Sequence, residues 1–385
     1  MRAFNVILVG CLSLLAGCQS PHPAEVRRTK DDFAELRVPF ETSINPDAGR
    51  GNLILLKVRL QDGQEVSVVL DTGAGITCVD DSQTSKLGRS VGKITAHHWG
   101  KDSKQKLYAA PALYLAGARL RGGKTVMAMD FKPMSVMCGE PVAGVLGMDV
   151  LKNYCVQIDF AAHKLRFLNP GPADELAWGR PFPMMPLNDQ DPRPAVAGNL
   201  LGEKTPHSLI DSGYDRGGWL MPKRYEQWTN KSTSATATAH SPDGRFHGEA
   251  YPDLKLVREN VELDGLGVQF LARHLVTLDF PKRTLYLKRT STGPLPDVGG
   301  TAVTFLHNLK ERGQLPGWTK DEDGKPRGVN QDAGINAMAF EVEKTGETSI
   351  YHYQVRRATE GSLWKLVKAW RTDARGRVLE EYPVP

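Results

Sequence analysis

Two aspartates in this sequence each follow a short apolar run and precede a hydroxyl residue and a glycine. Asp71 ends the run Val68-Val69-Leu70, and Asp211 ends the shorter run Leu209-Ile210. An apolar run that stops at a turn rich in small residues is typical of a buried strand, so each strand would carry one carboxylate inward. Burying a lone carboxylate is costly unless it is hydrogen-bonded, paired or neutralised. Both aspartates are therefore candidates for chemistry rather than for solvation.

The two turns, Asp71-Thr72-Gly73-Ala74 and Asp211-Ser212-Gly213, resemble the active-site motif of retropepsin-like and pepsin-like aspartic proteases. The resemblance implies that the turns face each other and that Asp71 and Asp211 activate one water against a peptide bond. It also implies that Thr72 and Ser212 hydrogen-bond between the turns, while Gly73 and Gly213 leave room and donate backbone N–H groups.

The chemistry of such a pair follows from its charges. Two carboxylates about 3 Å apart cannot both ionise, so their pKa values separate and one proton is shared. The ionised member acts as general base toward water, and the protonated one polarises the substrate carbonyl. This reaction needs no metal and no organic cofactor.

One feature of the second turn departs from the family pattern. A small residue follows the motif in the family, as Ala74 does here, but Tyr214 and Asp215 follow Gly213. We expect a bulky ring and an extra acid at that place to widen or distort the dyad.

Hairpins are expected to position the first turn. A strand over residues 52–60, a turn at Asp62-Gly63 and a strand over residues 66–70 would deliver Asp71 at the end of the hairpin. Residues 93–108 read as an exposed hairpin, followed by strands over 112–120 and 125–129. The resemblance implies that this exposed hairpin is a flap over the substrate; a plain surface hairpin is the alternative.

An internal repeat links the two turns. A shift of 120 residues places Leu266-Gly267 on Leu146-Gly147 and Asp279-Phe280 on Asp159-Phe160. The aspartates of the two turns are 140 residues apart (211 − 71). The apolar-Gly element resembles the second signature of the family, in which Gly147 and Gly267 let a strand and a short helix pack behind each turn.

The repeat sets the predicted organisation. With 63 Gly and Pro residues (38 + 25) and many short apolar runs, the chain is expected to be mostly β. We expect two retropepsin-like β-barrel lobes in tandem, related by a pseudo-two-fold axis in a monomer. The lobes would span residues 37–169 and 182–289, with linkers over 170–181 and 290–300. The remaining residues, 301–385, are expected to form a small α+β domain.

That last segment carries its own pattern. Residues 303–312 read as an amphipathic helix, 315–334 as polar and turn-rich, and 338–344, 349–357, 363–371 and 378–382 as strands. Strand alternation would place Trp364, Leu366, Lys368 and Trp370 on one side, with the tryptophans in the core and a binding face as the alternative.

The N-terminus predicts export and lipid attachment. The apolar run over residues 6–16 is too short to cross a bilayer core of about 30 Å and reads as part of a signal peptide, residues 1–17. Leu15-Ala16-Gly17-Cys18 resembles the lipobox of bacterial lipoproteins, which implies a lipid on Cys18, a tether over 18–36 and a place in the cell envelope. An ordinary secretory signal with an incidental cysteine is the alternative.

Composition excludes several classes of function. A net charge of +5 without a dense basic cluster gives little support to nucleic-acid binding. Cys78, Cys138 and Cys155 would remain in the mature chain, too few for a disulfide scaffold, and no Cys/His spacing indicates zinc. The leading hypothesis is a lipid-anchored aspartic endopeptidase acting on a peptide or protein. The alternatives are a catalytically inactive peptide-binding lipoprotein of the same fold, or a working C-terminal domain for which the lobes are a scaffold.

Overall fold

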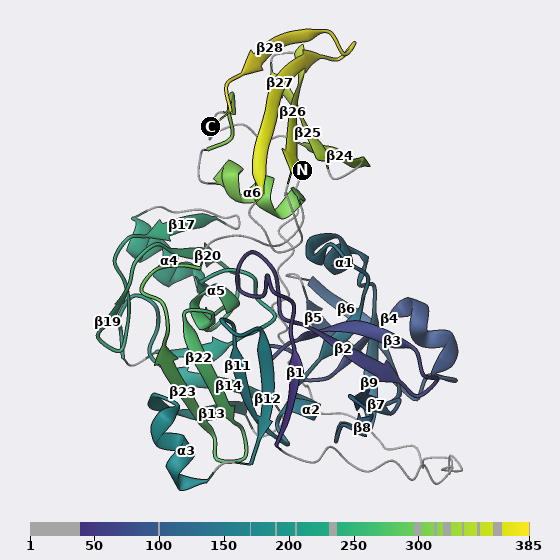
Figure 1. Cartoon of the computed structure of the whole chain (residues 1–385), viewed down its shortest axis with the longest axis vertical. Helices are drawn as coiled ribbons and strands as arrows, with labels where there is room; N and C mark the ends of the chain where they lie inside the picture. The colour runs from purple at the N-terminus through teal and green to yellow at the C-terminus, as the bar shows by residue number, and fades with distance from the viewer. Residues whose placement is uncertain are drawn as a thin grey trace.

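The structure, a computed structural model, describes residues 39–98, 101–169, 171–188, 191–204, 206–230, 237–295, 302–311, 314–318, 325–332, 335–344, 347–356 and 364–384. It is mostly β, with two large sheets and a separate five-stranded sheet toward the C-terminus (Figure 1). Among the described residues, the strand order of each large sheet is open at both edges. The predicted signal peptide, tether and Cys18 lie outside the described residues.

The first large sheet comes entirely from residues 55–146. Its strand order is β5 (Gly92–His98), β6 (Lys101–Ala109), β9 (Thr125–Met129), β4 (Cys78–Asp80), β10 (Val142–Leu146), β3 (Glu65–Leu70), β2 (Leu55–Leu60), β7 (Leu113–Leu115) and β8 (Ala118–Arg119). The expected hairpin over residues 93–108 is β5 and β6.

The second large sheet combines both halves of the chain. Its order is β1 (Phe40–Ser43), β12 (Lys164–Leu168), β11 (Cys155–Asp159), β22 (His274–Asp279), β23 (Thr284–Arg289), β13 (Arg180–Asn188), β14 (Asp191–Ala197), β15 (His207–Ile210), β21 (Asp264–Leu266), β16 (Gly218–Leu220), β20 (Leu254–Arg258) and β17 (Thr238–Ser241). The antiparallel pair β11–β22 joins the first half, residues 40–168, to the second half, residues 180–289.

Short helices and one small hairpin complete the two halves. They are η1 (Asp81–Lys86), α1 (Lys132–Cys138), α2 (Met148–Leu151), α3 (Pro172–Ala177), α4 (Pro222–Thr229), α5 (Val268–Leu271), and the hairpin β18 (Gly244–Phe246) and β19 (Glu249–Tyr251).

The strand pairings around the two aspartates repeat with a constant shift. Leu55 lies opposite Val69 in β2–β3, and Ala195 lies opposite Leu209 in β14–β15, a shift of 140 residues on both strands (195 − 55 and 209 − 69). The parallel pairs β3–β10 and β15–β21 also correspond, because Leu146 pairs with Leu70 and Leu266 with Ile210. At these positions the 120-residue shift expected from the sequence holds (266 − 146).

Burial explains why these strands form. Every residue of β3 after Glu65 is buried, and so are all of the residues of β15 except His207. The valines and Leu70 of β3 and Ile210 of β15 belong to one continuous hydrophobic core, together with aliphatic residues of both halves. The last strand residue before each aspartate, Leu70 or Ile210, is fully buried. A strand buried on both faces carries its terminal residue into the interior, which is how each aspartate comes to lie there.

Three predicted segments differ from the structure. Residues 112–120 form two short strands, β7 and β8, because Ala116 and Gly117 take positive φ and turn the chain between them. The expected linker 170–181 contains helix α3, and β13 already begins at Arg180. The short helix expected behind the first turn, over residues 148–154, is the single turn α2 (Met148–Leu151).

The C-terminal unit consists of α6 (Ala302–Glu311) and an antiparallel sheet (Figure 1). The sheet contains β24 (Lys325–Asp332), β25 (Ile335–Lys344), β26 (Glu347–Arg356), β27 (Lys365–Asp373) and β28 (Val378–Tyr382). The helix and β28 were predicted, whereas β24 lies where a turn-rich segment was expected.

The prediction that Trp364, Leu366, Lys368 and Trp370 share one side of a strand is wrong. An irregularity in the pairing of β26 with β27 shifts the register between Leu366 and Lys368, so alternation is interrupted there. Trp364 and Leu366 are buried in the core that contains α6. Trp370 is only partly buried and stacks instead on His352, with ring centroids 4.9 Å apart.

Candidate active site

The two predicted aspartates meet between the halves of the molecule. Asp71 follows β3 and Asp211 follows β15, and both are fully buried. The backbone N–H of Asp71 donates to the Leu146 carbonyl at 3.1 Å, and that of Asp211 donates to the Leu266 carbonyl at 2.9 Å. Each turn is therefore fixed by the strand that lies parallel to its own.

Thr72 and Ser212 join the two turns by reciprocal hydrogen bonds. The N–H of Thr72 donates to Ser212 Oγ, and the N–H of Ser212 donates to Thr72 Oγ1, both at 3.0 Å. Each hydroxyl in turn donates across the junction at 2.7 Å, Thr72 to the Ile210 carbonyl and Ser212 to the Leu70 carbonyl. These four bonds use both hydroxyls as donor and acceptor, so they fix the separation and orientation of the turns.

The carboxyl groups face each other across the glycines. Gly73 N–H donates to Asp71 Oδ1 and Gly213 N–H donates to Asp211 Oδ1, each at 2.8 Å. A Cβ on Gly73 would lie 2.4 Å from the carboxyl carbon of Asp211, and a Cβ on Gly213 would lie 2.4 Å from that of Asp71. Any side chain at either position would displace the opposite carboxyl, so glycine is required for close approach rather than for an unusual φ.

The second oxygen of each carboxyl, Oδ2, differs from Oδ1, which accepts from the glycine of its own turn; below, Oδ1 is called the inner oxygen and Oδ2 the outer one. Neither Asp71 Oδ2 nor Asp211 Oδ2 accepts a hydrogen bond from a donor elsewhere in the described part of the chain. Both atoms are buried. A buried carboxylate oxygen without a donor is costly, which favours protonation or a bound polar molecule at this point.

Burial raises the pKa values of both aspartates, and each carboxyl also shifts the pKa of the other. Burial raises the pKa of Asp71 to about 6, against the hydrogen bond from Gly73 and a hydrogen bond with Asp211. Burial, and then the charge of Asp71, raise the pKa of Asp211 well above its ordinary value. The two carboxyls are therefore coupled, and while one of them is charged the other is held protonated.

A buried ion pair beside the dyad was not foreseen from the sequence. Arg193 is held by Asp191, with Nε to Oδ1 at 2.9 Å and Nη2 to Oδ2 at 2.5 Å, and both residues are buried. The positive charge of Arg193 lowers the pKa of both dyad aspartates. The available signal was the spacing of Asp191 and Arg193 by two residues, which places both on one face of a strand.

Gly147 and Gly267 lie directly behind the two turns. A Cβ on Gly147 would lie 2.7 Å from the backbone of Ile76, and one on Gly267 would lie 2.3 Å from the Arg216 carbonyl oxygen. The residue after each glycine, Met148 or Val268, donates its N–H back to the turn at 2.8 Å. A backbone that approaches another backbone this closely leaves no room for a side chain.

Asp149 and Thr77 add a support that the sequence interpretation missed. Asp149 Oδ1 accepts hydrogen bonds from the N–H and the hydroxyl of Thr77, both at 2.7 Å. The same hydroxyl accepts from Gly147 N–H at 3.1 Å. In the second half Gly267 N–H donates to the Gly217 carbonyl at 2.9 Å instead, so this side-chain network is particular to the first half.

Tyr214 leaves the backbone of the second turn undistorted, contrary to expectation. The N–H of Tyr214 lies 3.4 Å from the Asp211 carbonyl oxygen, as the N–H of Ala74 lies 3.4 Å from that of Asp71. The Tyr214 ring is buried against Trp219, with centroids 4.6 Å apart in an edge-to-face arrangement. The large side chain that distinguishes this turn packs in a separate apolar cluster with Leu209 and Val257.

The acid after Tyr214 belongs to a local charge cluster. Asp215 lies 3.4 Å from Arg216 in an ion pair. Burial, and then the charge of Asp215, raise the pKa of the nearby Glu259 carboxyl to about 7, while the positive charge of Arg258 lowers it.

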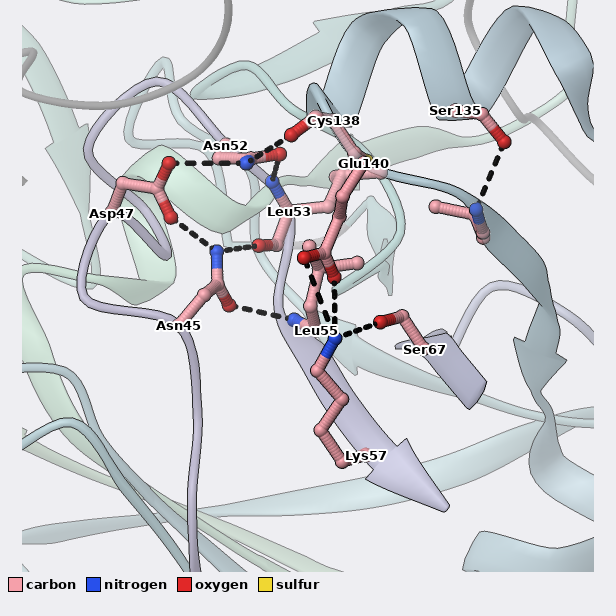
Figure 2. A network of polar contacts seen from close by, with 11 residues as sticks. Asn45, Asp47, Asn52, Leu53, Leu55, Lys57, Ser67, Ser135, Cys138 and Glu140 are labelled. Atoms are coloured by element: carbon pink, nitrogen blue, oxygen red, sulfur yellow. Dashed lines mark hydrogen bonds and ion pairs between the residues drawn. The ribbon is translucent and has the colours of Figure 1, made fainter. Parts of the chain in front are cut away.

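A polar network anchors the chain that leads into the first hairpin (Figure 2). Asn52 Nδ2 donates to Asp47 Oδ2 and to the Cys138 carbonyl, both at 3.1 Å, and Asn45 Oδ1 accepts from the N–H of Leu55. The start of β2 is thereby tied to the end of α1. Because β2 pairs with β3 along its length, the network holds the strand that carries Asp71.

The described residues contain no group of three or more His, Cys, Asp or Glu side chains that could hold a metal ion. Within the same ranges, no helix has the length and hydrophobicity that crossing a membrane requires. Cys78, Cys138 and Cys155 are buried free thiols.

Comparison with known proteins adds no assignment to this geometry: no protein-family model matches the chain, and no curated protein matches it at a significant level.

Proposed function

We propose that this chain is an aspartic-type endopeptidase in which Asp71 and Asp211 activate one water between them. The observation that carries the proposal is the facing pair of buried carboxyls, joined by the reciprocal hydrogen bonds of Thr72 and Ser212. A structural aspartate at a turn would have its oxygens satisfied by local donors. Here one oxygen of each carboxyl, Asp71 Oδ2 and Asp211 Oδ2, is buried without a hydrogen-bond donor among the described residues.

The mechanism follows from the two protonation states. Ionised Asp71 takes a proton from the water as the water attacks the carbonyl carbon of the scissile peptide. Protonated Asp211 donates a hydrogen bond to the carbonyl oxygen as negative charge develops there. The proton held by Asp71 then passes to the leaving amine when the C–N bond breaks, and the dyad returns to one proton. Gly73 and Gly213 N–H groups hold the inner oxygens throughout.

The proposed architecture is two retropepsin-like lobes in one chain, the first half and the second half. The support is the common register of β2–β3 with β14–β15 and of β3–β10 with β15–β21. In this arrangement an extended peptide would lie across the junction, and the hairpin β5–β6 would be the flap that covers it.

The competing proposal is an inactive peptide-binding protein of the same fold, motivated by Tyr214 and Asp215. The matched backbone contacts of the two turns favour retained chemistry, since the Tyr214 ring packs away into its own cluster. We also propose that a lipid on Cys18 anchors the protein in a bacterial cell envelope, because residues 15–18 resemble a lipobox.

The proposed activity is tested by incubating the protein with an unfolded protein substrate at pH 4 to 6 and identifying new termini by mass spectrometry. An aspartic peptidase produces internal cleavages that persist in the presence of a metal chelator and of serine- and cysteine-directed inhibitors. If the protein binds the unfolded substrate but does not cleave it over the same pH range, the result would support the peptide-binding protein instead.

A further inference from the structure

The first half contains a cavity that the proposed chemistry does not use. Its volume is about 370 Å³, within the range of small-molecule sites. It lies between the hairpin β2–β3, strands β4 and β10, helix η1 and the segment before β7. Most of its walls are apolar, including Val66, Val68, Leu113 and Val145.

The lining of the cavity runs beside β3, from the hairpin turn at Asp62 to Leu146, which lies opposite Leu70 in the sheet. Val66 and Val68 of β3 line it, and Val145 and Leu146 of β10 line its inner end. The walls beside β3 are therefore aliphatic, a surface that suits an alkyl chain.

The two ends of the cavity differ in polarity. At the hairpin end, Lys86 pairs with Asp62 at 2.8 Å, and both side chains are more than two-fifths exposed. At the inner end the walls are Cys78, Val145 and Leu146, all buried. The polar residue there, Thr77, already has its hydroxyl committed to Asp149 and Gly147.

We propose that this cavity binds the alkyl chain of a neutral single-chain amphiphile, with its polar head at the Lys86–Asp62 rim. The apolar inner end accepts a methyl terminus and offers no group to hydrogen-bond a polar one. The rim holds one positive and one negative charge already paired, so a net charge on the head gains nothing there. At about 30 Å³ per group, the volume of a water in the liquid, the cavity has room for roughly twelve methylene-sized groups.

The test is a chain-length series of linear 1-alkanols, from hexanol to dodecanol, titrated into the full chain and followed by methyl NMR. Affinity should rise about fourfold with each methylene, the ratio that corresponds to ~0.8 kcal/mol, and should stop rising near ten to twelve carbons. Decan-1-ol should bind more tightly than decanoate or decyltrimethylammonium. Affinity independent of length, no saturable binding, or a preference for either ion would overturn the proposal.

Variants locate the site. Ala143 lines the cavity and is half-buried, so Ala143→Phe should fill the space and abolish alkanol binding. Ala161→Phe adds the same ring at an exposed turn and should leave binding unchanged. In the unaltered protein, bound decan-1-ol should slow modification of Cys78 by a small thiol reagent and leave Cys155 unaffected, because only Cys78 lines the cavity. Equal protection of both thiols, or of neither, would contradict the assignment.

Discussion

Gln157 and Thr277 lie directly opposite each other in the pair β11–β22, and Gln157 Nε2 donates to Thr277 Oγ1 at 2.9 Å. These two positions are also related by the 120-residue shift of the repeat (277 − 157). The antiparallel pair therefore joins the halves at equivalent residues. Thr72 and Ser212, related by the 140-residue shift, meet in the same reciprocal way at the dyad. Both contacts are expected on an axis that relates one half to the other.

Thr72→Val should lower the stability of the fold. The substitution keeps the shape of the side chain but removes a hydroxyl that donates to the Ile210 carbonyl and accepts from Ser212 N–H. Each buried group left without a partner costs about 1–3 kcal/mol, so the free energy of unfolding should fall by about 2–6 kcal/mol. Urea unfolding measures this, with Thr95→Val on an exposed face of β5 as the control. Equal stability of the two variants would show that the turns are not held by these bonds.

Stability should decrease with rising pH because of Asp71. Its folded-state pKa is about 6, raised from 3.8, so between these values the folded protein holds a proton that the unfolded chain has released. The stability linked to the Asp71 proton is fully present below pH 3.8 and is lost as the pH rises through about 6. The loss in free energy of unfolding amounts to about 3 kcal/mol. Urea unfolding at a series of pH values measures this. In Asp71→Asn, whose side chain stays neutral, the free energy of unfolding should fall less between pH 4 and 7 than in the unaltered protein. The exposed Asp243→Asn should follow the unaltered protein. Parallel pH curves for all three proteins would refute a buried, protonated dyad.

Tyr214→Ala should destabilise the protein without increasing its activity. The ring is fully buried against Trp219, and truncation of large aromatic side chains in a core costs about 3–5 kcal/mol. The backbone of the turn is already matched to that of Asp71, so a small residue has no distortion to relieve. Thermal unfolding and peptide hydrolysis should be measured together, with Tyr214→Phe as the ring-preserving control. A rise in activity in the alanine variant would show that the tyrosine strains the dyad.

Cys18→Ser should release the protein from membranes. The thiol of Cys18 is the proposed site of lipid attachment, and serine has no thiol to alkylate. Cell fractionation and mass spectrometry of the N-terminus measure the outcome, and Cys11→Ser, within the expected signal peptide, is the matched control. Membrane association with the lipid intact in the Cys18 variant would exclude this anchor.

The sequence predicted most of what surrounds the dyad, because those features depend on local pattern. The apolar runs before Asp71 and Asp211, the glycines behind the turns and the shift between Leu146 and Leu266 were all readable from residue types and spacing. The close approach of Gly73 and Gly213 to the opposite carboxyls followed from the family resemblance, and the structure supplies its physical reason.

Features that depend on contacts between distant segments were not predictable in this way. The role of Asp149 depends on Thr77, 72 residues earlier, and nothing in either neighbourhood marks the pair. The effect of Tyr214 was misjudged because its packing partner, Trp219, is set by the fold of the second half. The place of Trp370 was misjudged because alternation cannot reveal an irregular register in advance.

The rate of peptide hydrolysis as a function of pH tests the shared proton most directly. With one carboxyl ionised and the other protonated in the active form, the profile should be bell-shaped with an acidic to mildly acidic optimum. Asp71→Asn and Asp211→Asn should each reduce the rate at that optimum by at least about 100-fold, and Asp243→Asn should leave it unchanged. Full activity in Asp211→Asn, or a rate that shows no dependence on two ionisations, would contradict a dyad formed by the two halves of this chain.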